Sequence, residues 1–444
     1  MNIAESAAVE QLFLARGWEK SESAQVADIV IINTCSVRET AENRIFGRLG
    51  WFAGLKAVRA CEPGAKHKSL EEAAEYVKDG PKPLTVVVMG CMAERLLNSL
   101  KKDYPCVDYV VGTYAKHHFG NIISAVEENS QTEQLDDTEA YKFAPLSYEQ
   151  GSFTAFVPIM HGCNNFCTYC IVPYVRGRER SRMPEDIIRE IEGAVADGVV
   201  EIMLLGQNVN SYCFGEVGFP ELMAMVAEIS PLLRVRFATS HPKDISDRLL
   251  EVMARYDNIC KAIHLPAQSG SNVMLEKMNR KYTREWYLER IAAIRRYMPE
   301  CAITTDLIAG FCGETLEDHQ ATLSLMREVG YAGAFMFKYS ERPDTFSARH
   351  FADDIADEEK TRRLNEIIAL QNQLSVESNE AEIGKIRQVL VEGTSKRSDE
   401  QLCGRTSQNK MVVFDRGDYK AGDYVTVKIT GCSSATLFGT EVLE

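Results

Sequence analysis

The chain has 444 residues, room for two or three domains, and its hydrophobic content of 45% can support real cores. It contains no run of 18 apolar residues that would span a membrane, and its first residues lack the basic region and cleavage site of a signal peptide. The net charge of −14 argues against a broad nucleic-acid-binding surface, but the acids cluster at 127–139 and 351–359, which leaves room for a local basic groove.

Residues 1–127 alternate between helical and strand patterns. Apolar positions at helical spacing over 4–17 precede a β-branched run at 27–34, and two further buried runs follow at 84–90 and 107–112. This alternation predicts a doubly wound parallel sheet. Because such a unit should open with a strand and this chain opens with a helix, we expect the first strand to precede Met1.

Two cysteines directly follow predicted strands in this region. Cys35 comes after the first run and Cys91 after the second. The carboxyl ends of parallel strands meet at one edge of the sheet, where ligands bind, so both thiols are expected to face one crevice. Ordinary buried cysteines remain an equally good interpretation of this pattern.

Residues 128–148 are polar and acidic and predict a linker. From residue 149 a strand and helix rhythm repeats, and a long charged helix at 357–380 ends it. The strands of this rhythm are expected at 154–160, 200–206, 233–239, 259–266, 301–310 and 333–340. Six such units predict a partial (β/α)6 barrel over 149–380.

The segment HGCNNFCTYC follows the first of these strands, which places it at the carboxyl face, where barrels of this kind keep their chemistry. Cys163, Cys167 and Cys170 have the spacing C-x3-C-x2-C, and soft thiolates suit iron–sulfur clusters. A cube held by three cysteines leaves one iron without a protein ligand. A Cys3His zinc site that includes His161 is the alternative, although structural zinc ligands more often come as two separated pairs.

Residues 381–444 change character to short alternating strands separated by Gly, Asp and Ser turns. They predict a small antiparallel β-barrel similar to an OB-like module. The bases of this segment match its acids in number, so a structural cap remains an alternative to an RNA-binding function. The 13 cysteines of a chain without a secretion signal predict metal or catalytic thiols in a reducing, cytoplasmic compartment.

The cysteine loop resembles the signature of the radical S-adenosylmethionine (SAM) enzymes. Seven other motifs (NTCSVRETAENR, MGCMAER, GQNVNSY, RFATSHPKD, HLPAQSGS, TTDLIAGFCGET and GRTSQNK) resemble the methylthiotransferase family. The loop with its following arginines is most similar to the tRNA-2-methylthio-N6-dimethylallyladenosine synthase branch. The last segment resembles the TRAM domain, an RNA-binding barrel.

The resemblance implies SAM and two 4Fe–4S clusters as cofactors. Cys163, Cys167 and Cys170 would hold the radical cluster. Cys35 and Cys91 would be two of three ligands to an auxiliary cluster that supplies or relays sulfur, with the third ligand two positions before Met1. The residues implied to contact SAM are Tyr169, Gln207, Asn208, Ser240, His241 and Gln268; for His241, support of a loop is an equally good interpretation.

The substrate implied by the resemblance is N6-isopentenylated adenosine beside the anticodon of a tRNA, which would receive a methylthio group at C2. No side-chain base can remove the unreactive C2 hydrogen, so a SAM-derived radical is needed. An electron donor such as flavodoxin or ferredoxin is expected, with no membrane and a monomeric chain. The residues expected to meet tRNA phosphates are Arg176, Arg178, Arg180, Arg182, Lys396, Arg397, Arg405 and Lys410.

Overall fold

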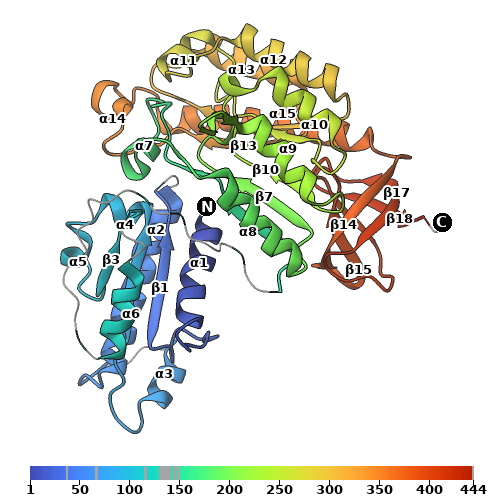
Figure 1. Ribbon diagram of the computed structural model, residues 1–444. Coiled ribbons are helices and arrows are strands. Elements are labelled where there is room, and N and C mark those ends of the chain that lie inside the picture. The colour runs from blue at the N-terminus through green and yellow to red at the C-terminus, as the bar shows by residue number, and fades with distance from the viewer. Residues whose placement is uncertain are drawn as a thin grey trace. The chain divides into compact units, whose positions relative to one another are not determined.

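The computed structural model of the chain describes residues 1–36, 39–65, 69–114, 118–128, 130, 141, 143, 148 and 151–442. The chain divides into two compact units, the first made of Met1–Ser147 with Ile171–Arg178 and the second of Tyr148–Cys170 with Glu179–Glu444. Figure 1 labels the elements of both units. The predicted linker lies almost wholly outside the described residues, and the three predicted boundaries between segments stay predictions.

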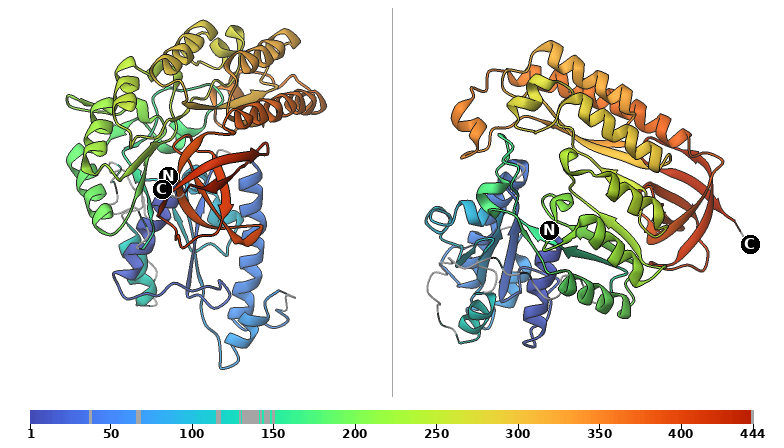
Figure 2. Two further views of the ribbon diagram at one scale, coloured as in Figure 1. Left: turned by 90° about the vertical axis from the view of Figure 1, so that its right-hand side faces the viewer. Right: turned by 45° about the horizontal axis from the view of Figure 1, so that its top comes forward.

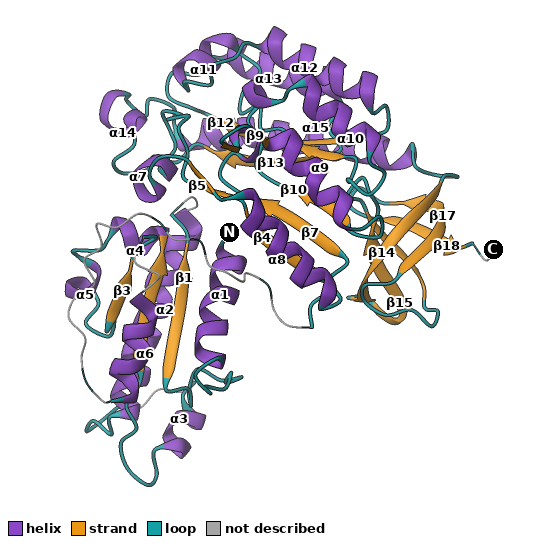
Figure 3. Ribbon diagram, viewed as in Figure 1, coloured by secondary structure: helices purple, strands orange, loops and turns teal. Residues whose placement is uncertain are grey.

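The first unit contains a parallel sheet with the strand order β1-β2-β3. Its strands are β1 (Ile29–Thr34), β2 (Thr85–Gly90) and β3 (Tyr109–Val111). Helices α1 (Asn2–Leu14) and α6 (Phe119–Glu127) share an apolar core with one face of the sheet. Helix α2 (Glu39–Arg59) packs on the other face, which confirms the predicted doubly wound arrangement (Figure 3). Shorter helices are α3 (Glu71–Tyr76), α4 (Cys91–Arg95), α5 (Leu100–Asp103) and α7 (Val172–Arg176).

The second unit contains the six parallel strands that the sequence predicts. They are β4 (Thr154–Pro158), β7 (Glu201–Leu205), β10 (Arg234–Phe237), β11 (Ala262–His264), β12 (Ala302–Ala309) and β13 (Gly333–Lys338). They form two three-stranded sheets, β10-β7-β4 and β11-β12-β13, and an isolated bridge joins Val235 to Ile259. The partial (β/α)6 barrel is thereby confirmed.

Helices cover the outer face of these strands. They are α8 (Pro184–Ala196), α9 (Phe219–Ile229), α10 (Asp247–Arg255), α12 (Arg284–Tyr297), α13 (Leu316–Val329) and α15 (Asp357–Glu380). The short helices α11 (Asn272–Lys277) and α14 (Phe346–His350) instead contact Thr168 of the cysteine loop. Side chains of Ser246, Ser271, Thr283 and Thr315 accept backbone N–H groups at the starts of α10 to α13, which fixes where these helices begin. Two short antiparallel strand pairs complete the second unit's barrel segment: β5 (Met160–His161) with β6 (Arg180–Ser181), and β8 (Cys213–Phe214) with β9 (Val217–Gly218).

The C-terminal strands close into a five-stranded barrel of order β14-β15-β16-β18-β17. They are β14 (Ile386–Ser395), β15 (Ser398–Arg405), β16 (Met411–Asp415), β17 (Tyr424–Cys432) and β18 (Leu437–Glu441). All pairs are antiparallel except β16 with β18, which is parallel. Helix α15 runs along β13 to this barrel, and Asn379 near its end donates to the Ser433 carbonyl at 2.9 Å (Figure 2). No described helix is long and apolar enough to cross a membrane.

Candidate metal centre and substrate-binding residues

The loop that carries Cys163, Cys167 and Cys170 begins where β5 ends and returns to β6. Gly162 and Phe166 have positive φ angles of 81° and 48°, which turn the backbone around the cysteines. The backbone N–H of Cys170 donates to the Cys167 carbonyl at 3.0 Å. Cys163 and Cys167 are buried and Cys170 is half-buried, so the three thiols lie on one short, tightly turned loop.

A segment at the end of α11 holds this loop in place, and no motif in the sequence indicated this role. The Thr168 side chain donates to the Lys277 carbonyl at 2.9 Å, and its backbone N–H donates to the Met278 carbonyl at 3.1 Å. The side-chain amide of Asn279 donates to the carbonyls of the two residues that precede Cys167. These bonds satisfy buried backbone groups that an irregular loop would otherwise leave unpaired.

Arg280 from the same segment reaches the cysteines directly. Its Nη1 lies 3.2 Å from Cys167 Sγ and 3.3 Å from the Tyr169 hydroxyl, and its Nη2 donates to the Pro266 carbonyl at 2.8 Å. The guanidinium is buried, so its charge acts on the sulfur with little screening by water. Burial raises the pKa of Cys163 to about 11, and a metal bound there would stabilise its thiolate.

The three thiols of the loop form a donor set that suits an iron–sulfur cluster, because soft thiolate ligands favour such clusters. In a 4Fe–4S cube each of the three cysteines would bind a different iron. A Cys3His zinc site would instead need four ligands on one ion.

Buried polar atoms lie after the ends of β7 and β10, near the carboxyl face. Among the described residues, Asn208 Oδ1, Ser240 Oγ and His241 Nε2 have no hydrogen-bond partner. Buried polar atoms of this kind are usually paired, so unpaired ones suggest a ligand with its own polar groups. Gln207 instead accepts the Gly162 N–H at 2.6 Å and so supports the cysteine loop.

The second ring nitrogen of His241, the backbone of Gln268 and the hydroxyl of Tyr169 are held by neighbouring protein groups. His241 Nδ1 accepts the Lys243 N–H at 3.3 Å, and burial lowers the pKa of this histidine, so the ring is neutral. It therefore supports its loop with one nitrogen and leaves the other for a ligand. Gln268 is buried at a positive φ of 69°. The ring of Tyr169 packs edge-on against Phe311 at 6.4 Å.

In the first unit, Cys35 and Cys91 follow paired residues at the carboxyl ends of β1 and β2. Thr34 is the register partner of Gly90, so the two cysteines emerge side by side despite their separation in sequence. Gly90 has a φ of 98°, and a Cβ there would lie 2.6 Å from the Thr34 carbonyl oxygen, so only glycine allows this approach. Their assignment as cluster ligands stays a prediction.

A buried arginine contacts one of these cysteines. Arg176 Nε lies 3.1 Å from Cys91 Sγ, and its Nη1 donates to Glu5 Oε1 at 2.8 Å. Both charged side chains are 4% exposed. Glu5 carried no sequence signal, and Arg176 was predicted to contact RNA. In this structure it has almost no surface to offer to a phosphate.

Some of the other predicted RNA contacts are held by protein partners, and the rest are exposed. Arg182 is buried in an ion pair with Glu190, and Arg405 pairs with Glu392 at 2.8 Å. Lys410 donates to Ser378 Oγ at 2.8 Å, and burial lowers the pKa of Lys410 to about 8. The exposed members of the set are Arg178, Arg180, Lys396 and Arg397.

The GRTSQNK motif runs from the end of β15 through a turn to β16, and it docks the C-terminal barrel onto the larger one. Arg234 donates to the Arg405 carbonyl at 2.7 Å, and Arg236 donates to the Thr406 carbonyl at 2.8 Å and to Glu201 at 2.7 Å. Glu201 and Arg234 begin β7 and β10, so this contact lies at the amino edge of the strands. The cysteine loop lies at the opposite, carboxyl edge.

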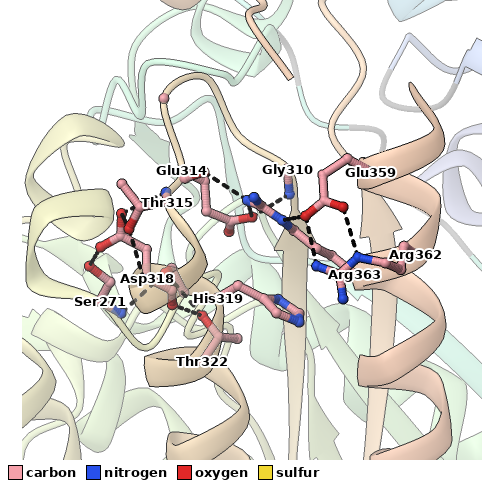
Figure 4. A network of polar contacts seen from close by, with 12 residues as sticks. Ser271, Gly310, Glu314, Thr315, Asp318, His319, Thr322, Glu359, Arg362 and Arg363 are labelled. Carbon is pink, nitrogen blue, oxygen red and sulfur yellow. Dashed lines mark hydrogen bonds and ion pairs between the residues drawn. The ribbon is translucent and has the colours of Figure 1, made fainter. Parts of the chain in front are cut away.

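The loop after β12 is tied to α15 by a polar network (Figure 4). Gly310 N–H donates to Glu314 Oε2 at 2.8 Å, and Arg363 Nη1 donates to the same oxygen at 2.8 Å. Arg363 also bonds Glu359 at 2.7 Å. The network fixes a loop at the carboxyl face to the helix that leads into the C-terminal barrel.

Comparisons with known proteins agree with this architecture. The matching family models are the Radical SAM superfamily (157–326), the uncharacterized protein family UPF0004 (1–78) and the TRAM domain (380–442). Proteins named tRNA-2-methylthio-N(6)-dimethylallyladenosine synthase from Bacteroides thetaiotaomicron and Parabacteroides distasonis are each 52% identical, over 100% of this chain and 94% of their own length. The chain belongs to this synthase family.

The family assignment confirms the resemblance of the motifs. Among solved structures, the radical SAM methyltransferase TsrM from Kitasatospora setae, with cobalamin and a 4Fe–4S cluster bound, has a TM-score of 0.52 at 14% identity. That alignment covers 77% of this chain and 65% of the other. At such low identity the likeness concerns the fold alone, and it supports the partial barrel.

Proposed function

We propose that this chain is a radical SAM methylthiotransferase that places a methylthio group at C2 of N6-isopentenyladenosine beside the tRNA anticodon. The observation that carries the proposal is the full-length similarity, at 52% identity, to relatives named for that product. The three-cysteine loop at the carboxyl face supplies the donor set that such chemistry needs. Hydrogen removal from an aromatic C–H bond lies beyond any side-chain base, and the site contains no acid–base pair assigned to it.

Cys163, Cys167 and Cys170 would hold the radical cluster, and when bound with SAM it supplies the one-electron chemistry that removes a hydrogen atom. Arg280 and Gln207 hold this loop in shape, and the unpaired atoms of Asn208, Ser240 and His241 suit the polar groups of SAM. Cys35 and Cys91 would hold an auxiliary cluster, which supplies or relays sulfur. Flavodoxin or ferredoxin as electron donor, a monomer and a cytoplasmic location belong to the same proposal.

The decisive experiment mixes the anaerobically reconstituted protein, SAM and a reductant with an anticodon stem-loop that carries N6-isopentenyladenosine. Mass spectrometry should detect the methylthio product. The variant Cys163→Ala should abolish it, while Cys213→Ala, a control at an exposed cysteine outside the loop, should not. Absence of product from the wild-type protein, or product only with a ribosomal-protein substrate, would overturn the proposal.

We further propose that exposed bases contact tRNA phosphates. Arg178, Arg180, Lys396 and Arg397 are exposed, whereas Arg176 and Arg182 are buried in ion pairs. Replacing Arg178 and Arg180 by Gln should weaken tRNA binding and lower the slope of log K against log salt by about 1 to 2. Unchanged affinity and an unchanged slope would remove these two arginines from the interface.

A further inference from the structure

We propose that Phe335 and Asp306, on the inner face of the β11-β12-β13 sheet, form the surface on which the target adenine is stacked and hydrogen-bonded. This inference rests on the proposed function, because it names the residues that would recognise the modified base of that tRNA. It concerns residues that the motifs and the comparisons leave without a role.

The register of the strands defines which side chains face inward. Ile303 and Leu307 of β12 are buried in the same core as Ile294 of α12 and Met326 of α13, so they face the outer helices. Side chains alternate along a strand, so Thr304 and Asp306 face the opposite way, into the barrel.

Neighbouring strands add two rings to this inner face. His264 of β11 is the register partner of Thr304, and Phe335 of β13 is the register partner of Asp306. Because partners in a parallel ladder share a face, the four side chains form one patch on the inner face, which we term the inner-face patch.

The inner-face patch is ordered but remains open. His264 Nδ1 lies 3.0 Å from Thr304 Oγ1, and its Nε2 lies 3.4 Å from Asp306 Oδ1. The imidazole meets the Phe335 ring edge-on, with ring centroids 5.8 Å apart. Phe335 keeps 56% of its surface exposed, and the Asp306 side chain keeps 28%.

This openness distinguishes the patch from an ordinary barrel interior. Side chains fill the inside of closed eight-stranded barrels, whereas this six-stranded barrel is partial. Here a large aromatic ring and a carboxylate stay accessible on the inner face, between the cysteine loop at the carboxyl edge and the docked turn at the amino edge. His264 is oriented by two neighbours and in turn fixes the Asp306 carboxylate.

The chemistry of the inner-face patch matches a purine that has been turned out of its loop. Unstacked RNA bases commonly stack on aromatic side chains and hydrogen-bond along their edges. An N6-isopentenylated adenine keeps one N6–H, which a carboxylate can accept, and its prenyl chain is apolar. Phe335 would therefore hold the face of the base and Asp306 its N6 edge, so that C2 is presented in a fixed orientation.

The test compares variants of Phe335 in the reconstituted enzyme with the isopentenylated stem-loop as substrate. Stacking on one aromatic ring predicts that Phe335→Ala raises KM about 5- to 100-fold, whereas Phe335→Trp restores it. Trp286→Ala is the control, because Trp286 is 39% exposed on α12, in the outer layer. The amount of 5′-deoxyadenosine formed with SAM alone should stay at the wild-type level in the Trp286→Ala control.

A second variant tests the carboxylate. Asp306→Leu should remove the preference for a substrate with a free N6–H over an N6-methylated analogue, a preference that the wild-type enzyme should show. If the wild-type enzyme makes product and Phe335→Ala leaves KM unchanged, the inference is wrong while the proposed function stands. If the wild-type enzyme makes no methylthio product from any tRNA substrate, the proposed function fails first.

Discussion

Replacing Arg363 by Ala should strongly destabilise the second unit, although Arg363 is far in sequence from the cysteine loop. Its guanidinium bonds the Glu314 carboxylate at 2.8 Å and the Glu314 carbonyl at 2.7 Å. The Glu314 side chain is 1% exposed and that of Arg363 is 8% exposed. Without the arginine, the carboxylate keeps the Gly310 N–H but has no countercharge.

The cost follows from this burial. Removing one partner of a buried ion pair typically costs about 3–5 kcal/mol, because the other charge stays desolvated. For a domain of this size such a loss lowers the midpoint of thermal unfolding by about 10 °C. Replacing both partners, as Glu314→Gln with Arg363→Met, should recover most of this loss, since no charge is then left buried and unpaired.

The assay can isolate the second unit. Trp286 lies in that unit and Trp18 and Trp51 in the first, so in a Trp18→Phe, Trp51→Phe background the fluorescence reports the second unit. Arg362→Ala is the matched control, because its side chain is 46% exposed and pairs with the same Glu359. It should cost less than about 1 kcal/mol. Equal effects of Arg362→Ala and Arg363→Ala would refute the reasoning.

Three further predictions concern other parts of the chain. Gly90→Ala should destabilise the first unit by about 1–3 kcal/mol because residue 90 has a positive φ, and the added Cβ would also clash with Thr34. Gly50→Ala in α2 is the control and should not destabilise the unit, because a Cβ there meets nothing within 4 Å. The fluorescence of Trp18 and Trp51 during unfolding measures the stability of both variants. In a Cys35→Ala, Cys91→Ala protein, Arg280→Met should lower the amount of iron bound after reconstitution, because Arg280 contacts Cys167. The control is Arg255→Met, at an exposed arginine. Equal amounts of iron in the two variants would contradict the role given to Arg280. Arg387 and Lys385 hold the pKa of Glu300 at about 2, below its ordinary 4.5, so this carboxylate stabilises the metal-free protein above pH 4.5 and loses that effect as the pH falls through about 2. Glu300→Gln should therefore lower the free energy of unfolding by under about 1 kcal/mol at pH 7, because the side chain is 52% exposed, and should not change it near pH 2. A difference between variant and wild type that stays constant from pH 7 to pH 2 would contradict the stabilising role given to this carboxylate.

The sequence predicted the strands well because each is a compact β-branched or apolar run. The runs at 27–34, 84–90 and 107–112 became β1, β2 and β3, and the parallel ladder then placed Cys35 beside Cys91. The six barrel strands followed the same logic. In barrels and sheets of alternating strands and helices, functional loops lie at the carboxyl ends of the parallel strands. The cysteine loop directly follows a predicted strand, so its place at the carboxyl face was predictable as well.

The burial and the ion-pair partners of individual charged residues were not predictable from the sequence. Arg176, Arg178, Arg180 and Arg182 look alike in the sequence, yet the first and last are buried in ion pairs and the middle two are exposed. Which arginine is buried depends on where Glu5 and Glu190 lie after folding. Such pairings depend on the folded arrangement of the chain and leave no periodic pattern in the sequence.

The supporting residues of the site were missed for the same reason. Arg280 lies about a hundred positions from the cysteines it contacts, and neither it nor Asn279 belongs to a residue type that signals iron–sulfur chemistry. The docking role of the GRTSQNK turn likewise depends on Arg234 and Arg236, which the sequence showed only as polar positions in a strand.

The central claim, that this chain removes hydrogen from C2 of an isopentenylated adenine and replaces it by a methylthio group, can be tested with a stem-loop deuterated at that carbon. The account predicts deuterium in 5′-deoxyadenosine, formed together with the methylthio product, and neither from the Cys163→Ala protein. Accumulation of the methylthio product while 5′-deoxyadenosine stays unlabelled would contradict it.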